Sequence, residues 1–375
     1  MFSVLAEFLS WSVIGIPAFI IIITIVVFFH ELGHFSVARF FGVAVQVFSV
    51  GFGRELFGWT DSLGTRWKVC LFPLGGYVKF AGDANVASKP DEEALRGMDP
   101  ALRAGMLHFK PLYQRALVVA AGPLANFVLA IVVFAGMFMA MGRPVAVTEP
   151  VVGRVVEESA AAEAGIQEGD IIQSVDGREV LTFSEFAELI RTGNGSTVSI
   201  QIERDGQLFS VDATPRLEPV DPLGGSETVL RVGIGNATNW EPIGLLQALG
   251  IAVDRTWFIV ATTLGYVGGI LTGQAAPDQL AGPLGIAGVA GQVAQQGLAD
   301  FFGLIALISV SIGLINLFPI PVLDGGHLLY YGIEAVRGRP LGERAQEVGF
   351  RLGLAVVLSL MLLATFNDLV RFDLF

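Results

Sequence analysis

The sequence predicts a polytopic α-helical membrane protein with about four transmembrane helices, into which a β-rich membrane-associated loop and one α+β domain are inserted. Of the 375 residues, 53% are hydrophobic and only 15% are charged, and the mean hydropathy is +0.64. Four stretches are long and apolar enough to cross a bilayer, at about 11–41, 116–141, 301–321 and 348–366. The polar residues between the second and third stretches are numerous enough for a separate domain.

The first apolar stretch contains His30, Glu31 and His34. Two imidazoles four residues apart on a helix lie on the same face, which is the spacing that one Zn²⁺ needs, and Glu31 points where it can take a proton from water activated by the metal. A charge at membrane depth costs at least a few kcal/mol unless it is compensated, as a divalent cation held by neutral histidines beside a carboxylate would be. The motif therefore predicts a zinc hydrolase that works inside the bilayer.

A catalytic zinc needs a third protein ligand and an open position for water. The segment from Asn316 to His327 places Asp324, the only acid nearby, at the end of the third apolar stretch. That stretch runs in the same direction as the first, so both motifs fall toward the cytoplasmic side. Its prolines break the helix, which is tolerated at membrane depth where the freed carbonyls line a cavity or a bound polypeptide. We expect Asp324 to be the third ligand; a helix-end carboxylate in water is the alternative.

The charges predict the topology. Residues 39–115 hold 10 Lys/Arg and 7 Asp/Glu, a net charge of +3, whereas residues 141–298 hold 8 and 19, a net charge of −11. By the positive-inside tendency, the first loop is cytoplasmic and the second lies outside. The first span lacks the features of a cleaved signal peptide, so we expect it to be retained. The single Cys70 rules out an internal disulfide, and we expect no nucleic-acid partner.

Two segments between the spans have a recognisable character. Residues 45–80 alternate in hydrophobicity and are interrupted by glycines, which is typical of short β-strands joined by turns. The polar stretch 83–103 is expected to be a solvated loop. Residues 242–273 are apolar, but Asp254 and Arg255 interrupt them and favour an amphipathic helix on the outer surface over a fifth span.

Residues from about 145 to 217 form the inserted soluble domain. A strand-like segment at 151–156 is followed by glycine turns at Gly165, Gly169 and Gly177, a helix at 184–191, and strands near 197–203 and 207–213. This order resembles a bacterial PDZ domain, and an unrelated small α+β domain is the alternative. The remaining residues before the next span are too few for a second copy.

Taken together, these motifs resemble the site-2 protease family of intramembrane zinc metalloproteases, most closely the bacterial regulator of sigma-E protease branch. The resemblance includes Gly122-Pro-Leu-Ala-Asn126 in the second span and covers nearly the whole chain. It implies zinc ligation by His30, His34 and Asp324, a general-base role for Glu31, and an unwound substrate held by Asn316, Pro319 and Pro321. The single PDZ domain is a departure, because better-known enterobacterial relatives carry two, and it leaves open how strictly substrates are filtered by size.

The resemblance also implies substrates, partners and a location. We expect single-span membrane proteins, such as trimmed anti-sigma factors or leftover signal peptides, to be cleaved within their transmembrane segments after a site-1 protease has acted. We expect a multi-pass protein of the bacterial inner (cytoplasmic) membrane, in contact with membrane lipid and with the PDZ domain periplasmic. The β-like segment 45–80 could pair with the unwound substrate by strand addition.

The expected domains follow in chain order. They are a first transmembrane helix at 1–41, a β-rich loop at 42–114, a second transmembrane helix at 115–141, the PDZ domain at 142–220, a periplasmic linker with an amphipathic helix at 221–298, a third transmembrane helix at 299–324, and a cytoplasmic loop with the fourth transmembrane helix at 325–375. Among the other polar residues, we expect His327 to be either a partner of Asp324 or a solvated loop residue, Asn126 to form interhelical hydrogen bonds, and His108 to lie on the surface.

Two other classes of protein could place such residues in membrane spans. A zinc transporter would need neither a glutamate between the histidines nor a proline-broken helix and a PDZ domain. A membrane-anchored PDZ adaptor without catalysis would be expected to have lost Glu31 or a metal ligand, and none is lost. The sequence therefore favours a membrane-embedded zinc endopeptidase.

Overall fold

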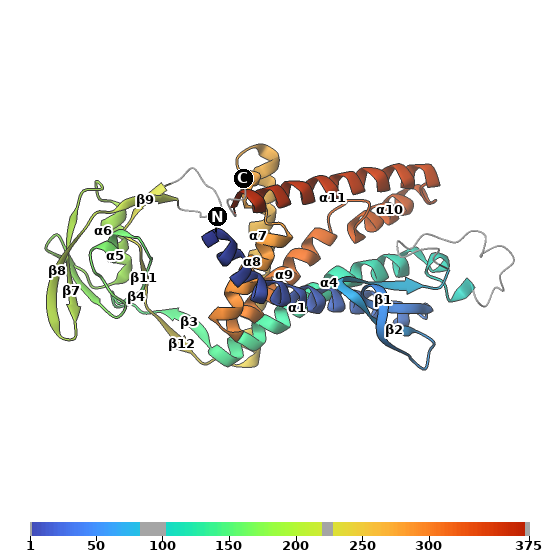
Figure 1. Cartoon of the computed structure of the whole chain (residues 1–375), viewed down its shortest axis with the longest axis horizontal. Coiled ribbons are helices and arrows are strands. Elements are labelled where there is room, and N and C mark those ends of the chain that lie inside the picture. The colour runs from blue at the N-terminus through green and yellow to red at the C-terminus, as the bar shows by residue number, and fades with distance from the viewer. Residues whose placement is uncertain (1, 83–102, 220–227, 372–375) are drawn as a thin grey trace. The chain divides into compact units, whose positions relative to one another are not determined.

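The computed structural model describes residues 2–82, 103–219 and 228–371. Nearly all of the polar stretch 83–103, expected to be a solvated loop, lies outside these residues. The chain divides into two compact units (Figure 1). The helical unit comprises residues 1–137, 249–264 and 278–375, and the β-rich unit comprises residues 138–248 and 265–277.

Five helices among the described residues are long and apolar enough to cross a membrane. They are α1 (Phe2–Phe40), α4 (Leu112–Met141), α7 (Leu245–Thr272), α9 (Leu298–Asn316) and α11 (Glu343–Arg371). Four of them, α1, α4, α9 and α11, overlap the four stretches predicted as spans. The fifth, α7, is the least apolar of the set, and its Asp254 and Arg255 are exposed. Helix α7 is a candidate span by its length and composition alone, so the expectation that it lies on the membrane surface stays a prediction.

A further helix, α8 (Pro283–Gln296), contributes to the core of the helical unit. It packs with α1 and α9 in a buried cluster of Ala18, Ile22, Val26, Ala290, Leu304, Ile305 and Ile308. The linker expected at 221–298 therefore contains a helix with one buried face. Its buried face consists of small residues, Gly285, Ala287, Ala290 and Gly291, which allow close helix packing without a strongly apolar sequence.

A long β-hairpin follows α1. Strands β1 (Val45–Thr60) and β2 (Arg66–Phe80) pair antiparallel. The alternation correctly predicted β-structure, but short strands joined by turns were expected and the structure has two long strands. Glycines such as Gly51 and Gly53 adopt positive φ within β1 and shift its register without ending it. Asp61 organises the turn by accepting hydrogen bonds from the Trp67 indole and from the backbone N–H groups of Leu63 and Thr65. The bond from Trp67, with these backbone bonds, holds the pKa of Asp61 below its usual value. The inner face of the hairpin, including the buried Phe48 and Val78, packs against α1.

The third predicted span ends earlier than expected. Helix α9 stops at Asn316, and the chain is non-helical until α10 (Asp324–Arg337) begins. Two prolines in this interval prevent helical hydrogen bonding. Gly325 allows the interval to fold back over the start of α10, because a Cβ there would lie 2.2 Å from the carbonyl oxygen of Phe318. The bound of 299–324 for one continuous helix is therefore corrected, and Asp324 belongs to the next helix.

The β-rich unit is built around a four-stranded sheet of order β6-β5-β7-β8. Its strands are β6 (Arg178–Glu179), β5 (Ile171–Val175), β7 (Val198–Arg204) and β8 (Gln207–Ala213). The remaining strands form three antiparallel pairs, β4 (Val152–Val155) with β11 (Ile234–Asn236), β3 (Arg143–Ala146) with β12 (Thr238–Glu241), and β9 (Arg216–Pro219) with β10 (Thr228–Arg231).

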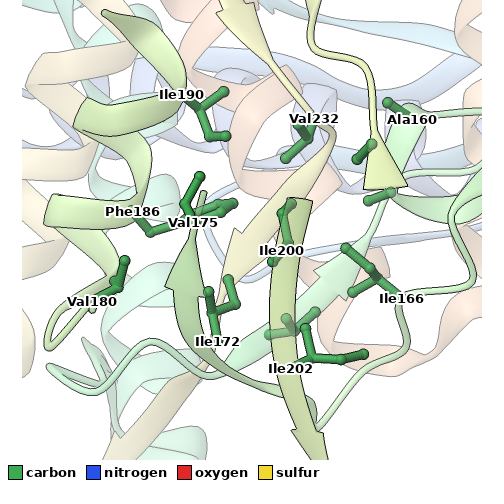
Figure 2. Close-up of a cluster of buried hydrophobic side chains, with 13 residues drawn as sticks. Ala160, Ile166, Ile172, Val175, Val180, Phe186, Ile190, Ile200, Ile202 and Val232 are labelled. Atoms are coloured by element: carbon green, nitrogen blue, oxygen red, sulfur yellow. The ribbon is translucent and has the colours of Figure 1, made fainter. Parts of the chain in front are cut away.

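Two helices, α5 (Ala160–Glu163) and α6 (Phe183–Arg191), supply part of the core of this unit. Figure 2 shows Phe186 and Ile190 of α6 beside Ile172 and Ile200 of the sheet. Helix α6 begins with a capping box, in which the Thr182 side chain and the Glu185 side chain each satisfy a backbone N–H of the first turn. The strands predicted near 197–203 and 207–213 coincide with β7 and β8.

Candidate metal centre

Three potential ligand atoms converge inside the helical unit. His30 Nε2 lies 3.2 Å from His34 Nε2, and Asp324 Oδ2 lies 3.1 Å from His30 Nε2 and 3.5 Å from His34 Nε2. All three side chains are shielded, with 11%, 12% and 18% of their surfaces exposed. Among the described residues, they form a group of His, Cys or acidic side chains able to hold one metal ion.

The spacing of these atoms fits zinc. Ligand atoms about 2.0–2.1 Å from one Zn²⁺ in a tetrahedral arrangement lie about 3.3 Å from each other, close to the separations observed here. Asp324 Oδ2 is also buried without a hydrogen-bond donor, although a buried carboxylate oxygen normally has one. Two imidazole nitrogens and a carboxylate oxygen are typical zinc ligands, so the residues present fit the ion.

Helix α1 places both histidines on one face, and α4 holds His34 in position. His34 Nδ1 lies 2.9 Å from the carbonyl oxygen of Val118, to which Nδ1–H donates, so the lone pair of Nε2 points toward the cluster. The two helices can approach closely only at small residues. A Cβ on Gly33 would lie 2.2 Å from the Ala121 carbonyl oxygen, and a Cβ on Gly122 would lie 2.2 Å from His34 Nε2. Gly122 therefore makes room for the imidazole itself.

The cluster opens onto a cleft of about 570 Å³. Glu31 lines this cleft beside the three candidate ligands, as do Gly76, Tyr77, Val78 and Phe80 of β2. Glu31 and the strand are close, because a Cβ on Gly76 would come within 3.3 Å of Glu31 Cγ. A carboxylate, a metal-binding group and a strand thus share one cavity.

The three residues expected to hold substrate do not all line the same cleft. Asn316 and Pro321 line the same cleft as Glu31, and the Asn316 side-chain amide donates to the Ile312 carbonyl oxygen at 3.0 Å. Pro319 does not line this cleft; it lines a separate cavity of about 610 Å³ together with residues of α10 such as Leu328 and Ile333. Its visible contribution is to keep the interval after α9 non-helical.

The rest of the cleft is partly polar. His327, on α10, and His108, in the short 3₁₀ helix η1 (Leu107–Phe109), both line it, so His108 is half-buried at the cleft and not simply on the surface as expected. Arg115 of α4 makes two hydrogen bonds to Glu334 of α10, at 2.6 and 3.1 Å. Because Glu334 and Asp324 share α10, this pair helps to hold Asp324 against the histidines.

The family model of peptidase family M50 matches residues 18–360. A protein of Rhizobium meliloti named as a zinc metalloprotease is 46% identical over 360 residues, covering 94% of this chain and 96% of that relative. Metalloprotease MmpA of Caulobacter vibrioides is 41% identical over 387 residues, covering 96% of this chain and 97% of the relative.

A solved PDZ domain of a Listeria monocytogenes protein is 25% identical to this chain and covers 24% of it, with a TM-score of 0.20. That score is too low to establish a fold, so the PDZ assignment of residues 142–220 stays a prediction. The family model and the two relatives, in contrast, match nearly the whole chain, so they establish the family. The chain belongs to peptidase family M50, the site-2 protease family, and is a zinc metalloprotease with membrane-spanning character.

Proposed function

We propose that this protease hydrolyses peptide bonds within the transmembrane segments of single-span membrane proteins, such as trimmed anti-sigma factors or leftover signal peptides. The observation that carries the proposal is the position of the metal-binding cluster. His30 and His34 lie within the apolar segment Val13–Phe40 of α1, which has 28 residues and is long enough to span a membrane. Their nitrogens converge on a carboxylate oxygen that has no hydrogen-bond donor. A protease built this way meets its substrate at membrane depth.

We assign the zinc ligands as His30, His34 and Asp324 and the general base as Glu31. Zinc held by these residues would lower the pKa of water toward neutrality and would polarise a scissile carbonyl. The carboxylate of Glu31 takes the proton of the attacking water and passes it to the leaving amine. Asn316 and Pro321 lie in the same cleft, where their side chains can contact the substrate backbone.

The substrate has to unwind, because a helix hides its scissile bonds. Strand β2 belongs to a two-stranded sheet among the described residues, and its residues Gly76, Tyr77 and Val78 line the cleft that contains Glu31. An extended substrate pairing with this strand would regain the main-chain hydrogen bonds lost on unwinding. Strand addition therefore presents the unwound segment beside the base.

Cleavage in proteoliposomes tests the catalytic assignment. Glu31→Gln keeps the volume of the side chain and leaves the ligands intact, so zinc content and substrate binding should persist while cleavage falls at least about a hundredfold, the usual scale for a positioned acid–base group. Glu168→Gln, at an exposed position of the β-rich unit, is the matched control and should cleave normally. Near-normal cleavage by Glu31→Gln would show that Glu31 is not the general base.

We further propose that the protein lies in the bacterial inner membrane with the β-rich unit in the periplasm, and that this unit acts as a filter after a site-1 protease has acted. The acidic stretch 141–298 and the basic stretch 39–115 support this orientation. Selectivity would then arise from a cost imposed on untrimmed substrates and not from added affinity for trimmed ones.

The pairing of β3 with β12 shows where most of the β-rich unit can be deleted. Because β3 pairs with β12, with Val145 opposite Asn239, residues 147–237 can be replaced by an Asn-Gly turn that joins the two strands. The filter proposal predicts nearly intact cleavage of a shortened substrate and new cleavage of the full-length one. If a folded, zinc-loaded deletion variant no longer cleaved the shortened substrate, the unit would be a recruiting module.

A further inference from the structure

Asn126 is a fully buried polar residue in the middle of α4. Its amide nitrogen Nδ2 lies 3.3 Å from Nδ1 of His30, and its Oδ1 is buried without a hydrogen-bond partner. The sequence suggested only that this amide joins helices. Its contact with a candidate zinc ligand is more specific than that.

The protonation of His30 decides which amide atom belongs at this contact. A neutral imidazole that binds zinc through Nε2 keeps its lone pair there and carries its proton on Nδ1. The group facing Nδ1–H must then accept a hydrogen bond, and on Asn126 only Oδ1 can do so. Turning the amide about its Cβ–Cγ bond exchanges Nδ2 for the partnerless Oδ1. The opposite orientation would favour a proton on Nε2 and oppose metal binding.

A third helix fixes the backbone of Asn126. Ser309 of α9 donates its hydroxyl to the Asn126 carbonyl oxygen at 2.9 Å, and both residues are fully buried. The two helices also approach at Gly313, where a Cβ would lie 3.1 Å from the Cβ of Asn126. The backbone position of Asn126 is therefore set by α9 contacts that do not involve His30.

The two histidines thus have matching supports of different chemical kinds. His34 Nδ1 faces the backbone carbonyl of Val118, which no side-chain substitution removes. His30 Nδ1 faces the side chain of Asn126, which can be removed. The difference allows one support to be tested by mutation.

We propose that Asn126 is a positioning residue of the zinc site, whose Oδ1 accepts the hydrogen bond from His30 Nδ1–H and so fixes the tautomer and ring orientation in which His30 Nε2 binds zinc. This inference rests on the proposed assignment of His30 as a ligand. Substituting such a supporting partner typically weakens metal affinity about 10–100-fold.

Zinc affinity, measured by competition with a chelator on the purified full chain in detergent, tests the proposal. Asn126→Leu keeps a similar volume but cannot accept a hydrogen bond, so it should bind zinc about 10–100-fold more weakly. Asn126→Asp can accept from Nδ1–H and should restore the affinity. The visible absorption of the Co²⁺-substituted protein should change for Asn126→Leu and return toward wild type for Asn126→Asp, which a purely structural role would not produce.

Ser309→Ala is the packing control, because it removes the bond to the Asn126 backbone and leaves the amide in place. Unchanged zinc affinity in Asn126→Leu, an equal loss in Ser309→Ala, or no rescue by Asn126→Asp would each overturn the inference. His30→Ala separates this failure from failure of the ligand assignment. If His30→Ala weakens zinc binding and Asn126→Leu does not, only the positioning role is wrong; if His30→Ala has no effect, the ligand assignment itself fails.

Discussion

Asp170 in the β-rich unit and Asp324 in the helical unit are both shielded from solvent, yet only Asp170 is surrounded by hydrogen-bond donors. Arg204 donates from Nε and Nη2 to the two oxygens of Asp170, each at 2.7 Å, and the backbone N–H of Gln167 donates at 2.8 Å. Asp324 Oδ2 instead faces the imidazole nitrogens of His30 and His34 and has no donor.

The presence or absence of hydrogen-bond donors distinguishes a carboxylate that stabilises the fold from one that is available to bind a metal ion. Burial alone would raise the pKa of Asp170, but the hydrogen bonds from Arg204 and Gln167 and the charge of Arg204 bring it below its ordinary value. That arrangement is complete without a ligand. Two imidazole lone pairs beside a carboxylate repel each other unless a cation lies between them. A buried carboxylate oxygen without a donor, next to paired histidines, therefore indicates a metal site.

The largest expected effect comes from filling the space that His34 occupies. A Cβ at Gly122 would lie 2.2 Å from His34 Nε2, so Gly122→Ala should displace the ring, lose zinc, and lower cleavage by about a hundredfold, as misplacements of about 1 Å can. Gly136→Ala is the control on the same helix, because nothing lies within 4 Å of an added Cβ there. Equal zinc content and activity in both variants would show that Gly122 does not shape the site.

The second prediction concerns zinc-linked stability. A ligand present at 100 times its Kd stabilises the folded state by about 2.7 kcal/mol. Asp324→Asn should lose most of this gain, because a carboxamide is a poor zinc ligand. In chelator-treated protein it should be at least as stable as wild type, since the charge on a buried carboxylate oxygen without a donor has been removed. Thermal unfolding with and without chelator measures both effects. A destabilised Asp324→Asn protein in chelator would mean that Asp324 is structural, like Asp170.

The third prediction concerns the ion pair between Asp170 and Arg204, which should affect the stability of the β-rich unit. Arg204→Leu leaves a buried carboxylate short of donors, which should cost about 1–3 kcal/mol and accelerate amide hydrogen exchange in β5 and β7 without altering zinc content. Arg191→Leu removes an exposed pair with Glu188 and should cost less than about 1 kcal/mol. If the two substitutions had equal effects on exchange, the burial of Asp170 would carry no special stability.

The smallest effect is a pH dependence of the β-rich unit. Because the pKa of Asp170 is lower in the folded state, its contribution to stability is fully present above the unfolded value of about 3.9 and is lost as pH falls through the folded pKa. Hydrogen exchange in β5 and β7, corrected for intrinsic rates, should show this loss in acid, and Arg204→Leu should flatten it. If hydrogen exchange depended on pH equally in the wild type and in Arg204→Leu, the acid sensitivity would have to come from groups other than Asp170.

The parts of the site that the sequence predicts are those fixed by local geometry. Helical spacing alone places His30, Glu31 and His34 together. Asp324 needed the additional argument that the first and third spans run in the same direction, and the structure brings it to the histidines. Strand alternation likewise predicted β-structure at 45–80, although not that it forms one hairpin of two long strands.

What the sequence could not predict depends on how helices cross. Gly122 and Asn126 matter because α4 passes α1 at that point, and no periodicity reveals the crossing. Helix α8 was missed because its buried face is made of Gly and Ala, which have little apolar signal. Pro319 and Pro321 signalled a broken helix, but only the fold shows that Pro321 alone of the two lines the cleft.

Metal analysis of the purified full chain tests the central claim most directly. The account predicts one zinc per chain in the wild type, and a reduced zinc content in each of His30→Ala, His34→Ala and Asp324→Ala, because a three-ligand site loses a bond that solvent replaces poorly. Glu31→Gln should keep its zinc in the same measurement. Undiminished zinc in Asp324→Ala, in protein shown to be folded, would contradict the account and remove the partnerless carboxylate from the site.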